Sequence, residues 1–287
     1  MALGKAATVP RPFGTGTGKK ATGGGVLSST RWPQARIELA QSVWGENQLC
    51  PETAALMRSW TTVLGLDPAM NVIEIGAGLG GLSRYMHLQS GVYTLGFESD
   101  PALREAAETS ASQWGLRRKT RFASFDAQNP KFKGVRPGTI DRALLHSTLP
   151  KVRNPLKLVA ELAGIMRNGG QILIGEVFLK SGAINDPLLS AWQDAQTHRG
   201  VMATVDDFEA ELENQGFEVH VNADMTPEYC SAISQAWTTY LAKIFGKETS
   251  VKSLSAALAE SECWMLTRRA MKNNVIEFRR ITATLRQ

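Results

Sequence analysis

The chain has no stretch of about 20 consecutive apolar residues, the length that a helix needs to cross a bilayer. We therefore expect no membrane span. Cysteine is scarce: Cys50, Cys230 and Cys263 lie far apart, and no pair has the spacing of a zinc site or a disulfide framework. Scarce, unpaired cysteines fit a reducing compartment, so we expect a cytoplasmic protein. Because no pair has metal-site spacing, we also expect that it binds no metal.

Acidic residues are absent from residues 1–37, which carry six lysines and arginines. The net charge is +5, so the remaining 250 residues carry about −1. A nearly neutral body has no basic stripe for phosphate contacts, and we expect no specific nucleic-acid partner. The sequence leaves the oligomeric state open.

Residues 1–30 are rich in Gly and Thr, are basic and lack apolar periodicity, so we expect them to be disordered. They contain no apolar core of the kind that a secretory signal needs. An acid-free basic N-terminus is also compatible with an organelle transit peptide and a matrix location. The glycines argue against the amphipathic helix of such a peptide.

Residues 31–68 form a helical covering segment in our interpretation, followed by the main domain at 69–287. Apolar side chains fall at helical spacing from Pro33 to Trp44, and a second helix is predicted from Pro51 to Leu64. A polar Gly-Glu-Asn-Gln break at 45–48 separates the two.

From residue 71 onward, short apolar segments alternate with helical ones, which predicts an α/β fold with a parallel sheet. The expected strands are 71–75, 92–97, 120–125, 140–145 and 171–177. The tail departs from this order, with strands at 217–221 and 275–281 separated by a long helical stretch. This predicts an antiparallel final strand and a helical cap built from insertions at about 182–215 and 226–265.

Residues 71–86 read Asn-Val-Ile-Glu-Ile-Gly-Ala-Gly-Leu-Gly-Gly-Leu-Ser-Arg-Tyr-Met, a strand, a glycine loop and the start of a helix. Such a turn brings the backbone close to a nucleotide at a helix N-terminus. Gly76, Gly78 and Gly81 also satisfy the dinucleotide fingerprint, with Glu98 near the position of a ribose-binding acid. An NAD-dependent oxidoreductase is therefore one interpretation.

Three further features favour another nucleotide. Glu74 stands two residues before the first glycine, Asp126 ends the third strand, and Asn168-Gly169-Gly170 leads into the fifth. With these motifs in this order, residues 36–287 resemble the class I S-adenosylmethionine-dependent methyltransferases. The resemblance implies a Rossmann-like, mostly parallel seven-stranded sheet and S-adenosyl-L-methionine as cofactor.

In that family the glycine loop wraps the methionine part of the cofactor, the acid after the second strand binds the ribose, and the acid after the third binds the adenine amino group. The positions that match these contacts here, together with the segment after the fourth strand, are Glu74, Gly76, Ala77, Gly78, Gly80, Glu98, Ser99, Asp126, Ala127, His146 and Ser147. Each acid also has a purely structural interpretation: Glu74 as a helix cap, Glu98 as a solvated strand end, Asp126 as a turn former.

Three more residues are candidates, and His146 is a candidate for a second role. His146, at the end of the fourth strand, either orients the acceptor and takes a proton or packs against the cofactor. Glu176, at the end of the fifth, either holds the acceptor or is a buried structural carboxylate. Trp44 either closes over the cofactor or anchors the core. Gln48 is expected to reach the cofactor.

Motifs that the sequence lacks narrow the possible classes of methyl acceptor. No Asn-Pro-Pro-Tyr or Asp-Pro-Pro-Tyr follows the fourth strand, which argues against methylation of base or glutamine amino groups, and the acids there do not resemble the metal-dependent catechol type. What remains is a small molecule methylated on an amine, a phenol or enol, or an activated carbon. A non-catalytic, cofactor-binding scaffold or assembly subunit of the same fold remains the alternative.

Overall fold

The computed structural model describes residues 31–51, 54–196, 200–245 and 251–286. The predicted disordered N-terminus, residues 1–30, lies outside the described residues. Within this part of the chain the strands are β1 (Asn71–Ile75), β2 (Tyr93–Glu98), β3 (Thr120–Ser124), β4 (Ile140–His146), β5 (Met166–Leu179), β6 (Phe217–Asp224) and β7 (Ile276–Leu285). The helices are α1 (Gln34–Trp44), α2 (Ala54–Leu64), α3 (Gly81–Ser90), α4 (Pro101–Gln113), α5 (Pro155–Ile165), α6 (Pro187–Ala195), α7 (Val205–Asn214), α8 (Thr226–Ile244) and α9 (Val251–Lys272), with a 3₁₀ turn η1 (Leu149–Lys151).

The strands form one seven-stranded sheet in the order β3-β2-β1-β4-β5-β7-β6. The pairs from β3 to β5 are parallel, whereas β7 runs antiparallel to both of its neighbours. The predicted α/β fold with an antiparallel final strand is confirmed. The predicted bounds of the last three strands are too short: β5, β6 and β7 extend beyond the apolar segments, and the added residues pair with neighbouring strands.

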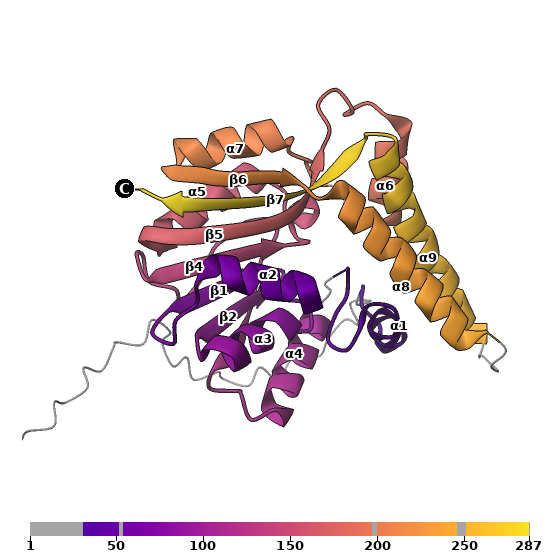
Figure 1. The fold of residues 1–287 in the computed structure, drawn as a ribbon, viewed down its shortest axis with the longest axis horizontal. Helices are drawn as coiled ribbons and strands as arrows, with labels where there is room; N and C mark the ends of the chain where they lie inside the picture. The colour runs from indigo at the N-terminus through magenta and orange to yellow at the C-terminus, as the bar shows by residue number, and fades with distance from the viewer. Residues whose placement is uncertain (1–30, 52–53, 197–199, 246–250, 287) are drawn as a thin grey trace, which may run out of the picture.

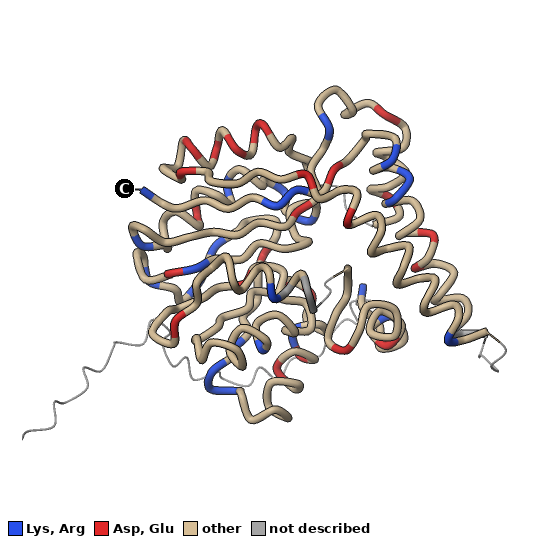
Figure 2. The backbone as a smooth tube through the Cα atoms, in the orientation of Figure 1, with Lys and Arg blue, Asp and Glu red and all other residues tan. Residues whose placement is uncertain are grey.

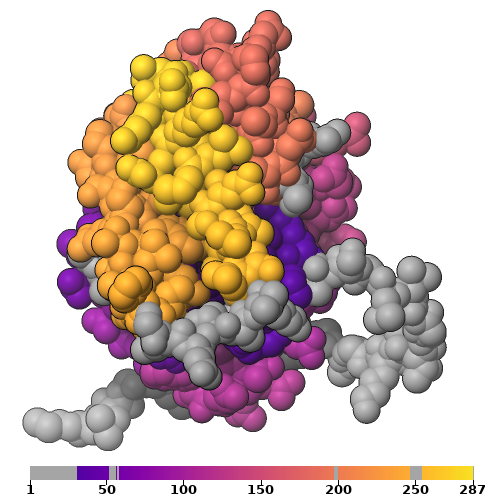
Figure 3. Space-filling view, turned by 90° about the vertical axis from the view of Figure 1, so that its right-hand side faces the viewer, coloured from indigo at the N-terminus to yellow at the C-terminus, as the bar shows by residue number. Residues whose placement is uncertain are grey.

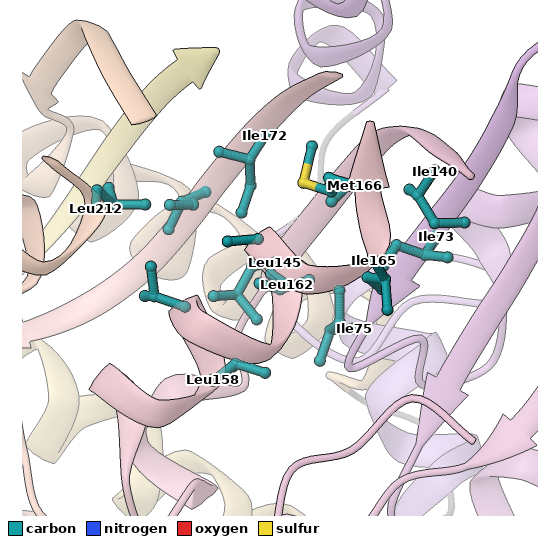
Figure 4. Close-up of a cluster of buried hydrophobic side chains, with 14 of the residues drawn as sticks. Ile73, Ile75, Ile140, Leu145, Leu158, Leu162, Ile165, Met166, Ile172 and Leu212 are labelled. Carbon is teal, nitrogen blue, oxygen red and sulfur yellow. The ribbon is translucent and has the colours of Figure 1, made fainter. Parts of the chain in front are cut away.

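The two faces of the sheet bury separate clusters of apolar side chains. On one face, β-strand side chains pack against α5 and α7, as Figure 4 shows for Ile73, Ile75 and Leu145 beside Leu158 and Leu162. On the other face, Val72, Leu144 and Leu173 pack under α2 and α3. This division follows from the alternation of side chains along each strand.

Helix starts follow the local chemistry. Asp100, the N-cap of α4, accepts hydrogen bonds from the backbone N–H groups of Ala102 (2.9 Å) and Leu103 (3.3 Å), with Pro101 at the first helical position. These caps fix the loops at the carboxyl ends of the parallel strands. That edge is where ligands bind in open α/β sheets.

Helices α6, α8 and α9 lie together over this edge, with α1 beside them (Figure 1). Figure 3 looks onto this side of the molecule and shows α8 and α9 covering it side by side. α1 packs on them through Leu39 and Val43, which share a buried cluster with Tyr229, Trp237 and Trp264. The four helices form a roof over the strand ends, which we call the cap.

No helix in the described ranges has both the length and the apolar content needed to span a bilayer. In the view of Figure 2 basic and acidic residues are interspersed over the body, and acids gather on α7.

Candidate functional site

A cavity of about 120 Å³ lies between the glycine loop and the cap. Its walls include seven of the residues predicted to form the site, namely Glu74, Gly76, Ala77, Gly78, Glu98, His146 and Ser147. The cap contributes the opposite wall, including Trp192, Tyr229 and Trp264. The topology therefore brings the loops after β1, β2 and β4 together under one roof.

The glycine loop has conformations that only glycine adopts without strain. Gly76, Gly78 and Gly80 have φ values of +83°, +52° and +71°. A Cβ at Gly76 would overlap the Thr148 hydroxyl and lie 2.7 Å from the His146 carbonyl oxygen. The first glycine therefore lets the β4 loop approach the β1 loop directly.

Glu98 joins the glycine loop to the end of β2. Its Oε2 accepts a hydrogen bond from the Gly78 N–H at 2.8 Å, and its Oε1 accepts one from the Asp100 N–H at 2.8 Å. The residue is only 3% exposed, but it lines the cavity. Oε1 also accepts a hydrogen bond from the Ser99 hydroxyl at 3.3 Å, so the second lone pair of Oε2 is the one left for a hydroxyl group of a ligand.

Glu74 is buried on the floor of the cavity, and its Oε2 accepts a hydrogen bond from the Ser83 hydroxyl on α3. This bond ties the end of β1 to the first turn of the following helix. Glu74 is not a cap of α3, because α3, with Gly80 as its N-cap residue, begins without a side-chain cap from the described part of the chain, and the bond joins two side chains. Its contact with a cofactor stays a prediction.

His146 ends β4 and is buried at the cavity wall. Its ring lies edge-on to Trp60, with centroids 4.7 Å apart, and its Nδ1 is 4.0 Å from the Cys50 Sγ. The next residue, Ser147, has a φ of +50°, which is a strained conformation for any residue other than glycine. Its hydroxyl lies 3.4 Å from the His146 Nε2. A histidine, a hydroxyl and a thiol thus meet at one point of the wall.

Glu176 is fully buried and does not line the cavity. Its Oε1 accepts a hydrogen bond from the Thr148 N–H at 2.6 Å, which fastens the loop after β4. Burial raises the pKa of this carboxyl to about 7, against the lowering effect of the Thr148 N–H and of His146. Its Oε2 has no hydrogen-bond partner among the described residues. The geometry favours a structural carboxylate that positions Ser147 and Thr148.

The other predicted site residues lie outside the cavity walls: Trp44, Gln48, Gly80, Ser99, Asp126 and Ala127. Trp44 packs edge-on against Trp264 at 4.7 Å between centroids, as a core anchor would. Asp126 is exposed and accepts a hydrogen bond from the Gln128 N–H at 2.9 Å, as a turn former does. Their proposed contacts with a cofactor stay predictions.

The covering segment between α1 and α2 contributes other residues than those predicted. Asn47, Leu49 and Cys50 line the cavity, while Gln48 is buried beside them. The Asn47 carbonyl oxygen would be 2.6 Å from a Cβ at Gly81, and Leu49 would be 3.1 Å from one at Gly78. The segment therefore packs directly on the glycine loop.

The cap wall also holds an ion pair that sequence reasoning missed. Arg36 Nε lies 2.8 Å from Glu260 Oε2, while Glu260 Oε1 accepts a hydrogen bond from the Trp264 indole N–H at 3.1 Å. Arg31 lies nearby, and burial together with the charge of Arg36 lowers its pKa to about 10. Arg36 and Glu260 are 224 positions apart in the chain. No local sequence signal pairs residues so distant.

The cavity fits a nucleotide cofactor at its floor. The glycine loop leaves room at the backbone, α3 begins there without a side-chain cap from the described part of the chain, and Glu98 Oε2 offers a lone pair for a ribose hydroxyl. His146 and Ser147 stand farther along the same wall, below the aromatic cap.

Comparisons with known proteins agree with this geometry. Among curated proteins, the chain is 25% identical over 122 residues to tocopherol O-methyltransferase of Arabidopsis thaliana, covering 42% of this chain and 34% of that protein. It is 29% identical over 104 residues to norajmaline N-methyltransferase of Rauvolfia serpentina, covering 36% and 35%. The chain thus spans about a third of the length of these relatives.

Among solved structures, the fold is similar to that of phosphoethanolamine N-methyltransferase 2 of Haemonchus contortus in complex with S-adenosyl-L-methionine. The TM-score is 0.77 at 15% identity, covering 91% of this chain and 59% of that one. The family model for the methyltransferase domain matches residues 49–221, which include the glycine loop, Glu98 and His146. The chain therefore belongs to the methyltransferase domain family.

Proposed function

We propose that the protein is an S-adenosyl-L-methionine-dependent methyltransferase that acts on a small molecule. The observation that carries this proposal is the hydrogen bond from the Gly78 N–H to Glu98 Oε2 at 2.8 Å, on the wall of a cavity that also contains His146. It joins the glycine loop to the strand-end acid, so one ligand can contact both. Family membership and the methyltransferase relatives support it.

Five groups would hold the cofactor. Gly76, Ala77 and Gly78 would surround its methionine part, Glu98 would accept from a ribose hydroxyl, and Glu74 would close the floor. When bound, the sulfonium would supply the electrophilic methyl group. Ser99, Asp126, Ala127, Trp44, Gln48 and Gly80 lie outside the walls of the cavity, and their contacts with the cofactor stay predictions.

The chain's own task is to position the acceptor and exclude water. In-line displacement needs an aligned nucleophile, and much of the rate comes from that alignment. His146 stands where it can orient the acceptor or take its proton, with Ser147 beside it. Glu176 acts through the backbone by fixing Thr148, so we regard it as a positioning residue.

The proposed acceptor is a small molecule that enters beneath the cap. The named relatives include an O-methyltransferase and N-methyltransferases, whose acceptors differ in chemistry. This diversity supports a small acceptor and leaves the methylated atom open. The nearly neutral body gives no support to a nucleic-acid substrate.

The proposal is tested by methyl transfer from methyl-labelled S-adenosyl-L-methionine to panels of amines, phenols and quinone precursors. We expect labelled product and S-adenosylhomocysteine in equal amounts with at least one panel, and a large loss in Glu98→Ala. Cofactor binding without turnover across all panels would favour the non-catalytic scaffold. Binding of NAD alone would favour an oxidoreductase.

A further inference from the structure

The loop after β4 places a lysine on the wall of the main cavity. Lys151 ends the 3₁₀ turn η1 a few residues after His146, and both residues line the cavity. The turn is closed by a hydrogen bond from the Lys151 N–H to the Thr148 carbonyl oxygen at 2.9 Å. Glu176 in turn accepts from the Thr148 N–H. The backbone at Lys151 therefore has a fixed position relative to His146.

The ammonium group of Lys151 has no protein counter-ion. The side chain is half-buried, and it makes no hydrogen bond or ion pair with any described residue. Lys180, which is also half-buried, is by contrast paired with Glu277 at 2.7 Å. Glu176 is the acid on which the Lys151 charge acts, but burial raises the pKa of that carboxyl to about 7, and no ion pair joins the two. The Lys151 charge is thus available to an anionic ligand in the cavity.

The end of helix α6 joins this turn to the roof of the cavity. The Gln193 amide donates to the Gly200 carbonyl oxygen at 3.2 Å, and a Cβ at Gly200 would lie 2.8 Å from the Pro150 carbonyl oxygen in η1. Arg31 donates through its Nη2 to the carbonyl oxygen of Gln196, the C-cap residue of α6. The turn and the arginine therefore both pack at the C-terminal end of one helix, and both line the cavity.

Charges of opposite sign line the two ends of the cavity. Two of the three carboxylates in its walls belong to the floor, and the third is Glu260 in the roof, which pairs with Arg36 at 2.8 Å. The cap end holds three basic side chains, those of Arg31, Arg36 and Lys151, against this one carboxylate. Positive charge is therefore in excess where an acceptor would lie beneath the cap.

The surroundings of Arg31 agree with this excess. Burial and then the charge of Arg36 lower the pKa of Arg31 to about 10, against the raising effect of groups that include Glu260. A cation whose charged form is disfavoured in this way is stabilised when an anion approaches it. An anionic ligand at the cap end would thus improve the electrostatics that the protein has without it.

The rest of this wall is aromatic. Trp192, Tyr229 and Trp264 line it. The neutral donors that α6 presents are already used, because the Trp192 indole N–H and the Gln196 amide both donate to Thr267 Oγ1, at 3.0 and 3.1 Å. A ligand beside α6 therefore meets ring surfaces and basic side chains. This combination suits a small acid with an apolar or aromatic body.

We propose that the methyl acceptor is a small anionic molecule that carries a carboxylate or a phosphate, and that Lys151 and Arg31 bind this group at the cap end of the cavity. The ammonium group would act as a point charge, and the guanidinium would donate to the oxygens. The other end of the molecule would lie toward His146, where methyl transfer is proposed. As a statement about the acceptor, this inference rests on the proposed function.

The test measures binding of small acids to the full chain by ligand-observed NMR, with and without S-adenosylhomocysteine. The probes are benzoate, phenyl phosphate and, as an uncharged control, benzyl alcohol. We expect at least one oxyanion to bind at least about tenfold more tightly than the alcohol, and Lys151→Gln to raise its Kd about tenfold. Which oxyanion binds more tightly distinguishes a carboxylate from a phosphate.

Two further variants separate a charge effect from a structural one. Lys151→Arg keeps the positive charge and should hold the Kd within about threefold of the wild type. Lys157→Gln removes an exposed lysine outside the cavity wall, whose Nζ donates to Asn129 Oδ1 at 3.0 Å, and should leave the Kd unchanged within about twofold.

Three results would each show that the inference is wrong. Neither oxyanion binds at millimolar concentration, the alcohol binds as tightly as the oxyanions, or Lys151→Gln raises the Kd no more than Lys157→Gln does.

A parallel titration with S-adenosyl-L-methionine separates the two proposals. Cofactor binding without oxyanion binding would overturn the anion site alone. Oxyanion binding that depends on Lys151, without cofactor binding, would overturn the proposed function and leave an anion site in the cavity.

Discussion

The floor and the roof of the cavity are built in different ways. The floor is made of loops at adjacent strand ends, where Gly78 and Glu98 are 20 positions apart and the Gly78 backbone N–H donates to the Glu98 carboxylate. The roof is made of the cap, where Arg36 meets Glu260 across 224 positions. The floor has fixed backbone geometry, and the roof is held by side chains. A floor of this kind suits a constant ligand, and such a roof can change with the acceptor.

The largest expected effect is on the floor. Gly76→Ala places a Cβ against the Thr148 hydroxyl and the His146 carbonyl oxygen at a φ of +83°. We expect the free energy of unfolding to fall by about 3 kcal/mol or more, because both strain and overlap must be relieved. Denaturant melts measure this. Gly134→Ala, at a positive φ with open space around it, is the matched control and should cost less. Equal costs would show that close packing at Gly76 is unimportant.

The contribution of Glu176 to the free energy of unfolding is expected to depend on pH. Its pKa is raised by burial from 4.5 to about 7, so the folded protein keeps this proton where the unfolded chain loses it. Its contribution to stability is present below about pH 4.5 and is lost as the pH rises through about 7. Over this range Glu176→Gln should gain roughly 3 kcal/mol relative to the wild type. A pH-independent difference between the two proteins in denaturant melts would contradict the raised pKa.

Glu98→Ala probes the floor through its ligand. Removing the carboxylate deletes the charged acceptor for a ribose hydroxyl, and we expect S-adenosyl-L-methionine affinity to fall about 10- to 100-fold. Asp126→Ala, at an exposed position outside the cavity wall, should have a smaller effect. Equal losses in calorimetry would mean that the loop after β3 moves onto the cofactor.

Substitutions in the roof should have the smallest effect on cofactor binding. Glu260→Gln removes the charge that pairs with Arg36 but keeps an oxygen for the Trp264 indole N–H. Because the Arg36 side chain is 22% exposed, we expect a loss of about 1 kcal/mol in stability and cofactor affinity within twofold. Arg286→Gln, which breaks an exposed pair with Glu218, should change stability by less than about 0.5 kcal/mol. A large drop in cofactor affinity in Glu260→Gln would remove the distinction between floor and roof.

The difference between floor and roof also explains which parts of the site could be predicted from the sequence. Glu74, the glycines and Glu98 follow apolar strands, and parallel strand ends meet at one edge, so their proximity could be expected. The alternation of elements likewise predicts the sheet. A helical cap could be expected, but its contacts could not be predicted, because helical periodicity in α1 and α9 identifies buried faces but not their partners. Cys50 becomes notable only once the fold places it beside His146.

Trp44, Gln48 and Glu176 show a further limit. The side chain of a polar or aromatic residue near a predicted site contacts either the ligand or the rest of the protein, and the sequence does not decide between the two. In the structure Trp44 packs on Trp264 and Glu176 holds the Thr148 N–H. Strand-end position therefore predicts proximity to a site better than it predicts contact with a ligand.

The most direct measurement of the central claim is a calorimetric titration of the full chain with S-adenosyl-L-methionine, with NAD titrated in parallel. We predict saturable binding of the sulfonium cofactor at one site per chain, weakened in Glu98→Ala, and no binding of NAD. Binding of NAD without binding of S-adenosyl-L-methionine would contradict the account.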